Sequence, residues 1–198
     1  MGPLMTPRLS PHACAALLIV AFILAGFAQT TWFAWKGSRA FAVPLDGGLT
    51  FRGRRLFGDN KTLRGLIVMV PAGAAALPIS AFLFSHILRS PTGLWPLTMG
   101  GYAAMGAWCA LGFMLGELPN SFLKRQLDIA PGTASTGRGL AWQLAADRLD
   151  SGIGLLLAAS LVVHVPWTTW AIVLSIGPIF HWSFSVLMFQ LGLKPRPA

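Results

Sequence analysis

Charge is scarce in this chain. Only 11% of its 198 residues are Asp, Glu, Lys or Arg, whereas a soluble domain carries about 25%. The mean hydropathy is +0.64, and 55% of the residues are hydrophobic. This composition excludes an ordinary soluble domain and predicts an integral membrane protein. The length suits one compact bundle, so we expect a single membrane domain over residues 1–198.

Acidic residues are rarer than basic ones. Six Asp and Glu face fifteen Lys and Arg, a formal charge of +9. Such an excess favours anionic partners, and in an apolar chain these are lipid head groups and nucleotide phosphates rather than nucleic acid. Cysteine is also scarce: Cys14 and Cys109 lie inside apolar runs. They form no zinc or disulfide framework, and we expect two small buried side chains.

Several catalytic motifs are missing. The chain has no HExxH, no GxSxG, no Ser–His–Asp order and no Walker A loop. It also shows no internal repeat and no heptad seam. The four histidines are scattered, and we interpret the deepest one, His181, as a packed histidine rather than a catalytic one. Chemistry that relies on a protein nucleophile is therefore not indicated.

Five apolar runs are present, and each is long enough to cross a ~30 Å hydrocarbon core as a helix. They cover residues 12–35, 65–88, 94–118, 142–165 and 167–190. The sequence thus predicts an all-α bundle of about five transmembrane helices. The first run could instead be a cleaved signal peptide. Lys36 and Arg39 follow it and only Arg8 precedes it, which favours an uncleaved span with its N-terminus outside.

The polar loops, residues 36–64 and 119–141, lie on one side in this topology. Together with the head of the fourth run and the C-terminal tail they hold thirteen of the fifteen basic residues. The positive-inside rule makes that side cytoplasmic, so the C-terminus is expected there as well. We expect the inner membrane of a prokaryotic cell, with both loops building one site that faces the cytoplasm.

Four of the six acidic residues fall within residues 116–154, between apolar runs. Ionisable groups beside a bilayer are functional by default. Asp147 and Asp150 share a helix face because they are three residues apart, and carboxylate oxygens are ligands that Mg²⁺ prefers. The alternative is a solvated helix start that the helix dipole favours.

A second constellation lies just upstream. Glu117, Ser121 and Lys124 line one face if the third helix continues past Pro119. Arg125 adds a bidentate donor for phosphate. The alternative is a basic turn that anchors the bundle to anionic lipid.

The segment GDNKTLRG, residues 58–65, precedes the second run. If a helix starts here, its free N–H groups form an anion site. The alternative is an ordinary helix cap with positive-inside charges. The candidate substrate-binding side chains of this segment are Asn60, Lys61, Thr62 and Arg64.

SFLKR at 121–125 followed by DRLDS at 147–151 resembles the S-x-x-K-R and D-R-x-D motifs of the CTP-dependent lipid cytidylyltransferases, the CDP-diacylglycerol synthases. The small size and the GDNKTLRG loop look more like the CDP-archaeol synthase branch. The C-terminal motif of that branch is matched by His181, Gly192, Lys194 and Pro197. Glu117 and Ser185 depart from the branch pattern, which has Asp and Asn there. The linker PGTASTGRG also lacks the PGHGG run of the diacylglycerol enzymes.

The resemblance implies a reaction: CMP passes from CTP to a membrane lipid phosphate, giving a CDP-lipid and pyrophosphate, with Mg²⁺ as cofactor. It also implies roles for the acids and bases. Asp147 and Asp150 would hold the metal, supported by Glu117. Lys124 and Arg125 would act in catalysis by neutralising phosphates. The remaining phosphates would be bound by Asn60, Lys61, Thr62, Arg64 and Ser121.

Other functions stay open from the sequence. The same chemistry could act on phosphatidic acid or another lipid phosphate. The chain could also be a non-enzymatic membrane scaffold or a transporter subunit. A CDP-alcohol phosphatidyltransferase is disfavoured because its DGxxAR motif is missing. The oligomeric state is open, and a homodimer is compatible with the sequence.

Overall fold

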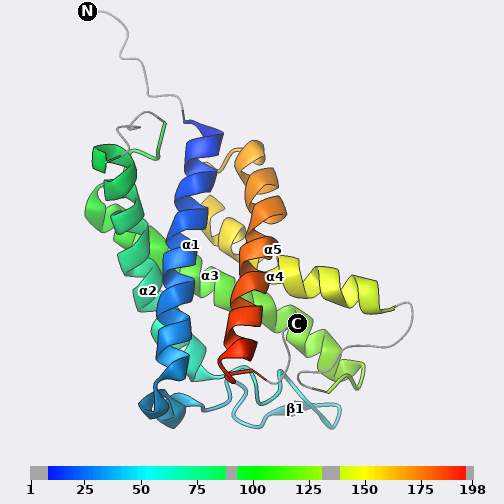
Figure 1. Ribbon diagram of the computed structural model, residues 1–198. Coiled ribbons are helices and arrows are strands. Elements are labelled where there is room, and N and C mark those ends of the chain that lie inside the picture. The colour runs from blue at the N-terminus through cyan, green and yellow to red at the C-terminus, as the bar shows by residue number, and fades with distance from the viewer. Residues whose placement is uncertain (1–8, 88–92, 131–138, 195–198) are drawn as a thin grey trace, which may run out of the picture.

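The protein is an all-α integral membrane protein, seen here in a computed structural model that describes residues 9–87, 93–130 and 139–194. Five long helices form the bundle: α1 (Pro11–Ala34), α2 (Leu63–Phe82), α3 (Met99–Gln126), α4 (Gly139–Ser160) and α5 (Trp167–Gln190). A π-helical turn, η2 (Leu83–Ile87), extends α2. Figure 1 shows that α1, α3 and α5 end at the same end of the bundle, where the connection between α1 and α2 also lies.

Four of the described helices are long and apolar enough to cross a membrane: α1, α2 with its π-helical turn, α3 and α5. Helix α4 differs because Asp147, Arg148 and Asp150 lie within its 22 residues. The number of spans and the orientation of the termini stay predictions. Cys14 and Cys109 are free and buried, as their apolar neighbourhoods predict.

Helix α3 is displaced from the predicted run 94–118. It begins at Met99, where the Thr98 hydroxyl accepts a hydrogen bond from the Gly101 amide at 3.1 Å. It then continues through Pro119 to Gln126, so the first part of the predicted loop 119–141 is helical. Two bases near its end, Lys124 and Arg125, suit the negative end of the helix dipole. Residues 131–138 of that loop lie outside the described residues.

Two glycine crossings fix α3 between its neighbours. An added Cβ at Gly73 of α2 would lie 2.5 Å from the carbonyl oxygen of Gly106. An added Cβ at Gly116 would lie 2.9 Å from the Cα of Gly154 of α4, and Gly112 meets the same glycine. Small residues let helix backbones approach this closely. The second crossing sets the residue after Gly116, Glu117, beside the acidic segment of α4.

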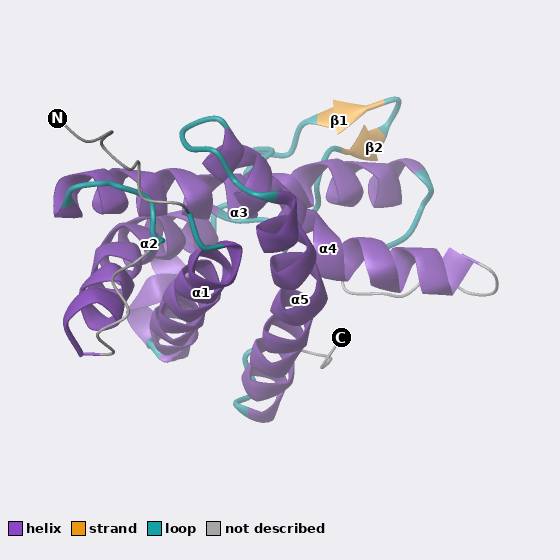
Figure 2. Ribbon diagram, turned by 90° about the horizontal axis from the view of Figure 1, so that it is seen from above, coloured by secondary structure: helices purple, strands orange, loops and turns teal. Residues whose placement is uncertain are grey.

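The loop between α1 and α2 is more structured than the sequence analysis predicted. It contains a 3-10 helix, η1 (Lys36–Phe41), and an antiparallel hairpin of β1 (Thr50–Phe51) and β2 (Arg54–Arg55), in which Phe51 pairs with Arg54. Arg52 and Gly53 at the tip have φ values of 53° and 76°, which suits the backbone twist of a two-residue hairpin turn. Figure 2 shows the hairpin at the edge of the molecule beside α3.

Candidate active site

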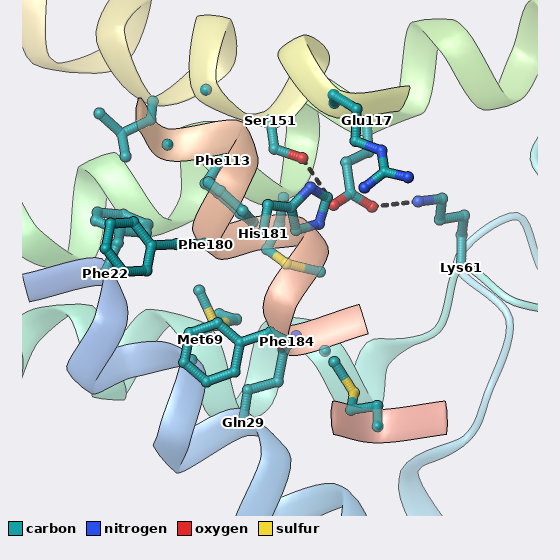
Figure 3. Close-up of a pocket in the computed structure, with 18 of the residues that line it drawn as sticks. Phe22, Gln29, Lys61, Met69, Phe113, Glu117, Ser151, Phe180, His181 and Phe184 are labelled. Atoms are coloured by element: carbon teal, nitrogen blue, oxygen red, sulfur yellow. Dashed lines mark hydrogen bonds and ion pairs between the residues drawn. The ribbon is translucent and has the colours of Figure 1, made fainter. Parts of the chain in front are cut away.

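A cavity of about 480 Å³ opens between the helices, and residues of all five helices line it. One part of its wall is apolar and aromatic, and the other is polar. Figure 3 shows the aromatic side chains on one side and the Glu117 carboxylate on the other. The apolar wall includes Phe22, Met69, Phe113, Phe180 and Phe184. The polar wall includes Asn60, Lys61, Thr62, Arg64, Glu117, Arg148, Ser151, His181 and Lys194.

Glu117 links the polar wall to α4. Its carboxylate accepts a hydrogen bond from the Ser151 hydroxyl at 2.8 Å and forms an ion pair with Lys61 (Figure 3). Burial alone would lower the pKa of Lys61, but the charge of Glu117 outweighs it and raises the pKa above its ordinary value. Lys61 therefore remains a cation at the edge of the cavity.

The segment before α2 brings its predicted side chains to the cavity. Helix α2 starts at Leu63, as the anion-site hypothesis required, and Thr62 occupies its N-cap position. Backbone hydrogen bonds from Leu45 to Lys61 at 2.8 Å and from Leu63 to Val43 at 2.9 Å hold the segment against the preceding loop. The predicted binding residues Asn60, Lys61 and Thr62 all line the cavity.

Arg64 also lines the cavity, but its guanidinium is engaged by the end of α1. It donates to the Phe33 carbonyl at 2.5 Å and to the Ser38 hydroxyl at 2.9 Å from Nε. It also lies over the Phe33 ring, 4.3 Å from the ring centroid. Arg64 therefore fixes α2 to the α1–η1 junction.

Asp46 is the buried centre of the loop and was missed by the sequence analysis. Its carboxylate accepts from Arg55 at 2.5 Å and from the backbone amides of Gly48, Phe57 and Gly58 at 3.1, 3.1 and 3.2 Å. The bond to Arg55 holds the pKa of Asp46 well below its usual range. Gly58 lies two residues before Asn60, the first of the phosphate-binding candidates, so Asp46 positions that segment. The signal in the sequence is an acid, followed by two glycines, in a loop rich in bases.

The two aspartates of α4 are brought together as their spacing predicted. The Asn120 side-chain amide donates to Asp147 at 2.6 Å and to Asp150 at 2.8 Å. Lys124 forms an ion pair with Asp147. One amide nitrogen thus touches an oxygen of each carboxylate. Asn120 was missed by the sequence analysis, although it lies between the predicted Glu117 and Lys124.

Ser151 connects these two groups of residues. Its hydroxyl donates to Glu117 at 2.8 Å and lies 3.2 Å from Asp150. A continuous polar network therefore runs from Lys61 through Glu117, Ser151 and the two aspartates to Lys124. Within the described part of the chain, no three His, Cys, Asp or Glu side chains are grouped to hold one metal ion. The oxygens of Glu117 meet Lys61 and Ser151 instead of completing such a group with the aspartates.

Two predicted residues lie outside both the cavity lining and the polar network from Lys61 to Lys124. Ser121 is only 7% exposed and Arg125 only 8%, and neither lines the large cavity. Arg125 lines a shallow hollow beside the hairpin together with Arg54, Arg55 and Asp128. The continued helix explains this placement, because consecutive residues point about 100° apart. Lys124 and Arg125 therefore do not act at one point.

The C-terminal motif contributes to the cavity. His181 lines it, edge-on to the Phe113 ring with a centroid separation of 5.9 Å. Lys194 donates to the Ser185 hydroxyl at 3.2 Å and also lines the cavity. Arg148 does so from α4, although the sequence analysis used it only to predict topology. Its position between Asp147 and Asp150 was the available signal.

The fold and the site define a helical membrane protein whose internal cavity joins an apolar wall to a network of acids and bases. The chain belongs to the CarS-like CDP-archaeol synthase family, whose model matches residues 17–197. This confirms the resemblance found in the paired SxxKR and DRxD motifs. The protein is therefore a CTP-dependent cytidylyltransferase that acts on a lipid phosphate. It is an enzyme rather than a scaffold.

Individual relatives agree with the family. The chain is 32% identical over 162 residues to the CDP-archaeol synthase of Halorubrum lacusprofundi, covering 78% of this chain and 83% of that one. It is 29% identical over 156 residues to that of Pyrococcus furiosus, covering 78% and 83%. A solved structure of an intramembrane enzyme for archaeal membrane lipid biosynthesis superposes with a TM-score of 0.58 at 24% identity. It covers 83% of this chain and 90% of its own, and shows the shared fold.

Proposed function

We propose that the protein transfers CMP from CTP to an ether lipid phosphate of the archaeal type, giving a CDP-lipid and pyrophosphate. The observation that carries this proposal is a cavity in which an apolar wall, suited to lipid chains, meets Lys61, Glu117 and Ser151, the part of the polar network that continues to the two aspartates and Lys124. The relatives named as CDP-archaeol synthases support the choice of acceptor. Phosphatidic acid is the alternative acceptor, because nothing in the apolar wall distinguishes an ether from an ester linkage.

Asp147 and Asp150 are the proposed Mg²⁺ ligands. Their carboxylates already converge on one polar atom, the Asn120 amide nitrogen, and carboxylate oxygens are the ligands that Mg²⁺ takes. When bound, Mg²⁺ would neutralise negative charge on the CTP phosphates. Asn120 orients both carboxylates. Glu117 is proposed to support them indirectly, since the Ser151 hydroxyl lies between it and Asp150.

The bases of the network are proposed to bind phosphates. Lys124 lies next to Asp147 and would bind the triphosphate. Lys61, with Asn60 and Thr62, lies at the N-terminus of α2, where the helix dipole favours anions. A phosphate oxygen of the lipid attacks the α-phosphorus of CTP, the bond from that phosphorus to the bridging oxygen breaks, and pyrophosphate leaves. Such a transfer needs positioning and charge neutralisation rather than a protein nucleophile.

The proposed site faces the cytoplasm of a prokaryotic cell. Thirteen of the fifteen bases belong to the segments assigned to that side by the positive-inside rule. In the structure the loop between α1 and α2 and the ends of α3 and α5 do lie at one end (Figure 1). Cytoplasmic CTP would reach the network directly from that end.

The test is a transfer assay with purified protein in liposomes, labelled CTP and Mg²⁺. The acceptors are an unsaturated archaeal ether lipid phosphate, phosphatidic acid and a polyprenyl phosphate. We expect lipid-extractable label with the ether lipid, lost on chelation of Mg²⁺ and in Asp147→Ala. Asp128→Ala is the matched control, because it removes an acid whose side chain is 69% exposed at the same end of the bundle. Label with phosphatidic acid alone would show that the acceptor is phosphatidic acid and not the ether lipid phosphate. No label with any lipid would overturn the proposal.

A further inference from the structure

Two cations of the polar wall differ from Lys61 and Arg64. Lys61 is paired with Glu117, and the guanidinium of Arg64 donates to the Phe33 carbonyl and the Ser38 hydroxyl. Arg148 and Lys194 also lie at the polar wall, yet within the described residues neither forms an ion pair. A partly buried cation without an acid is unfavourable unless an anion completes its site. The cavity itself is the place where such an anion would bind.

The two cations lie near one another and near His181, although they come from different elements. Burial lowers the pKa of Lys194, Glu117 opposes this effect, and the nearby charges of Lys61 and Arg148 lower the pKa further. The Ser185 hydroxyl orients the Lys194 ammonium through the hydrogen bond at 3.2 Å. His181 lies one helical turn before Ser185 on α5 and lines the same cavity. Arg148, Lys194 and His181 therefore place three donors on one part of the polar wall.

We propose that Arg148 and Lys194, with His181 as a further donor, form the binding site for the phosphate of the lipid acceptor. This inference rests on the proposed function and assigns the acceptor to its own set of residues. The acid pair and Lys124 do not line the cavity, so these proposed partners of the nucleotide are separate from the acceptor site. A ligand that reaches both Arg148 and the aromatic wall must carry a phosphate at one end and an apolar chain at the other.

The number of cations also sets selectivity. A phosphate monoester carries up to two negative charges near neutral pH, and Arg148 and Lys194 supply two positive ones. Arg binds phosphate oxygens in pairs through its planar guanidinium, and charge-assisted hydrogen bonds are stronger than neutral ones. A phosphodiester lipid has one charge and fewer free oxygens, so it binds more weakly. The site thereby selects the lipid that is not yet coupled to a second head group.

The first experiment is steady-state kinetics with both substrates varied. In Arg148→Gln and in Lys194→Gln we expect the KM for the lipid phosphate to rise about tenfold or more, with the KM for CTP within twofold. Lys194→Arg, which keeps the charge, should recover part of the loss. Lys36→Gln is the matched control, because it removes an exposed positive charge that does not line the cavity. A rise in the KM for CTP alone would assign these cations to the nucleotide and overturn the proposal.

A second measurement does not depend on turnover. Without CTP, a short-chain lipid phosphate should raise the unfolding temperature of the wild type, whereas the matched neutral lipid should not. The double variant Arg148→Gln/Lys194→Gln should lose this shift and keep a normal unfolding temperature without ligand. An undiminished shift in the double variant would overturn the phosphate site even if the enzyme is active. A wild type that binds the lipid phosphate but makes no product would instead contradict the proposed function.

Discussion

Two acidic sites in this protein differ in the groups that satisfy their carboxylates. Asp46, in the loop before α2, is surrounded by Arg55 and three backbone amides, and its side chain is fully buried. Asp147 and Asp150, on α4, share the side-chain amide of Asn120. Asp147 also pairs with Lys124, and Asp150 accepts from the Ser151 amide at 2.6 Å. The Asp46 carboxylate is saturated with fixed donors. The aspartate pair has one backbone donor, the Ser151 amide, and its other donors are side chains.

The difference separates a structural cluster from a reactive one. A carboxylate that is satisfied by backbone amides cannot release them without local unfolding, because each unpaired buried donor is unfavourable. The pair is held mainly by side chains, Asn120, Lys124 and Ser151, which can exchange the carboxylates for other partners without unfolding the backbone. We therefore expect changes at Asp46 to reduce stability first and changes at the pair to reduce activity first.

The largest effect should come from the pair. Asp150→Ala should reduce transfer by roughly 10²–10³-fold, the usual loss when one charged group of a reaction centre is removed. Its unfolding temperature should change little, because Asp147 retains Asn120 and Lys124. Turnover and thermal unfolding in the same detergent measure both effects. If Asp150→Ala were both inactive and strongly destabilised, the proposed difference between the aspartate pair and Asp46 would be wrong.

The converse effect is expected at Asp46. Asp46→Asn should lower the unfolding temperature at pH 7 by roughly 5 °C, because the charged bond to Arg55 is lost. Activity should fall less than in Asp150→Ala, through displacement of the segment with Lys61. Loss of transfer as great as that of Asp150→Ala, with stability intact, would make Asp46 part of the reaction centre.

The pH dependence gives an independent check. The folded-state pKa of Asp46 is depressed, so its contribution to stability is fully present above its unfolded pKa of about 3.9. That contribution is lost as the pH falls through this value toward the folded pKa. The difference in unfolding temperature between wild type and Asp46→Asn should therefore be constant from pH 7 to pH 5 and shrink below about pH 4.

The same comparison shows what the sequence could predict. The helices, the convergence of Asp147 and Asp150, and the start of α2 beside Lys61 follow from hydropathy and from spacing along one helix. These are local patterns, and the family resemblance rests on them too. The Asp46 cluster does not follow, because its donors are backbone amides whose direction is set by the turn around Phe57 and Gly58.

The division between Lys124 and Arg125 also escaped prediction. Adjacent bases in SFLKR suggest one phosphate site, but helix continuation through Pro119 turns Lys124 toward α4 and Arg125 toward the hairpin. The hairpin itself has only two residues in each strand, too few for a period-two pattern. Long-range placement of this kind depends on helix crossings such as that of Gly116 and Gly154, which spacing cannot reveal.

A smaller effect is expected at that crossing. Gly154→Ala places a Cβ against the backbone of Gly112 and Gly116 and should destabilise the bundle by about 1–3 kcal/mol, as overpacking does. Because the crossing sets Glu117 beside Ser151, activity should fall together with stability. Gly152→Ala is the matched control, since its added Cβ would meet only the end of the Leu174 side chain at 3.3 Å.

The smallest effect should be at the hairpin. Arg54 donates to the exposed carboxylate of Asp128 at 2.5 Å and to the Gln126 carbonyl at 2.9 Å, and exposed pairs contribute about 0–1 kcal/mol. Arg54→Gln should therefore leave both the unfolding temperature and the KM for CTP nearly unchanged. This outcome would restrict nucleotide binding to the α4 side of α3, where Lys124 lies. A large rise in the KM for CTP would instead place a CTP phosphate in the hollow of Arg54 and Arg125, so that both faces of α3 would serve the reaction.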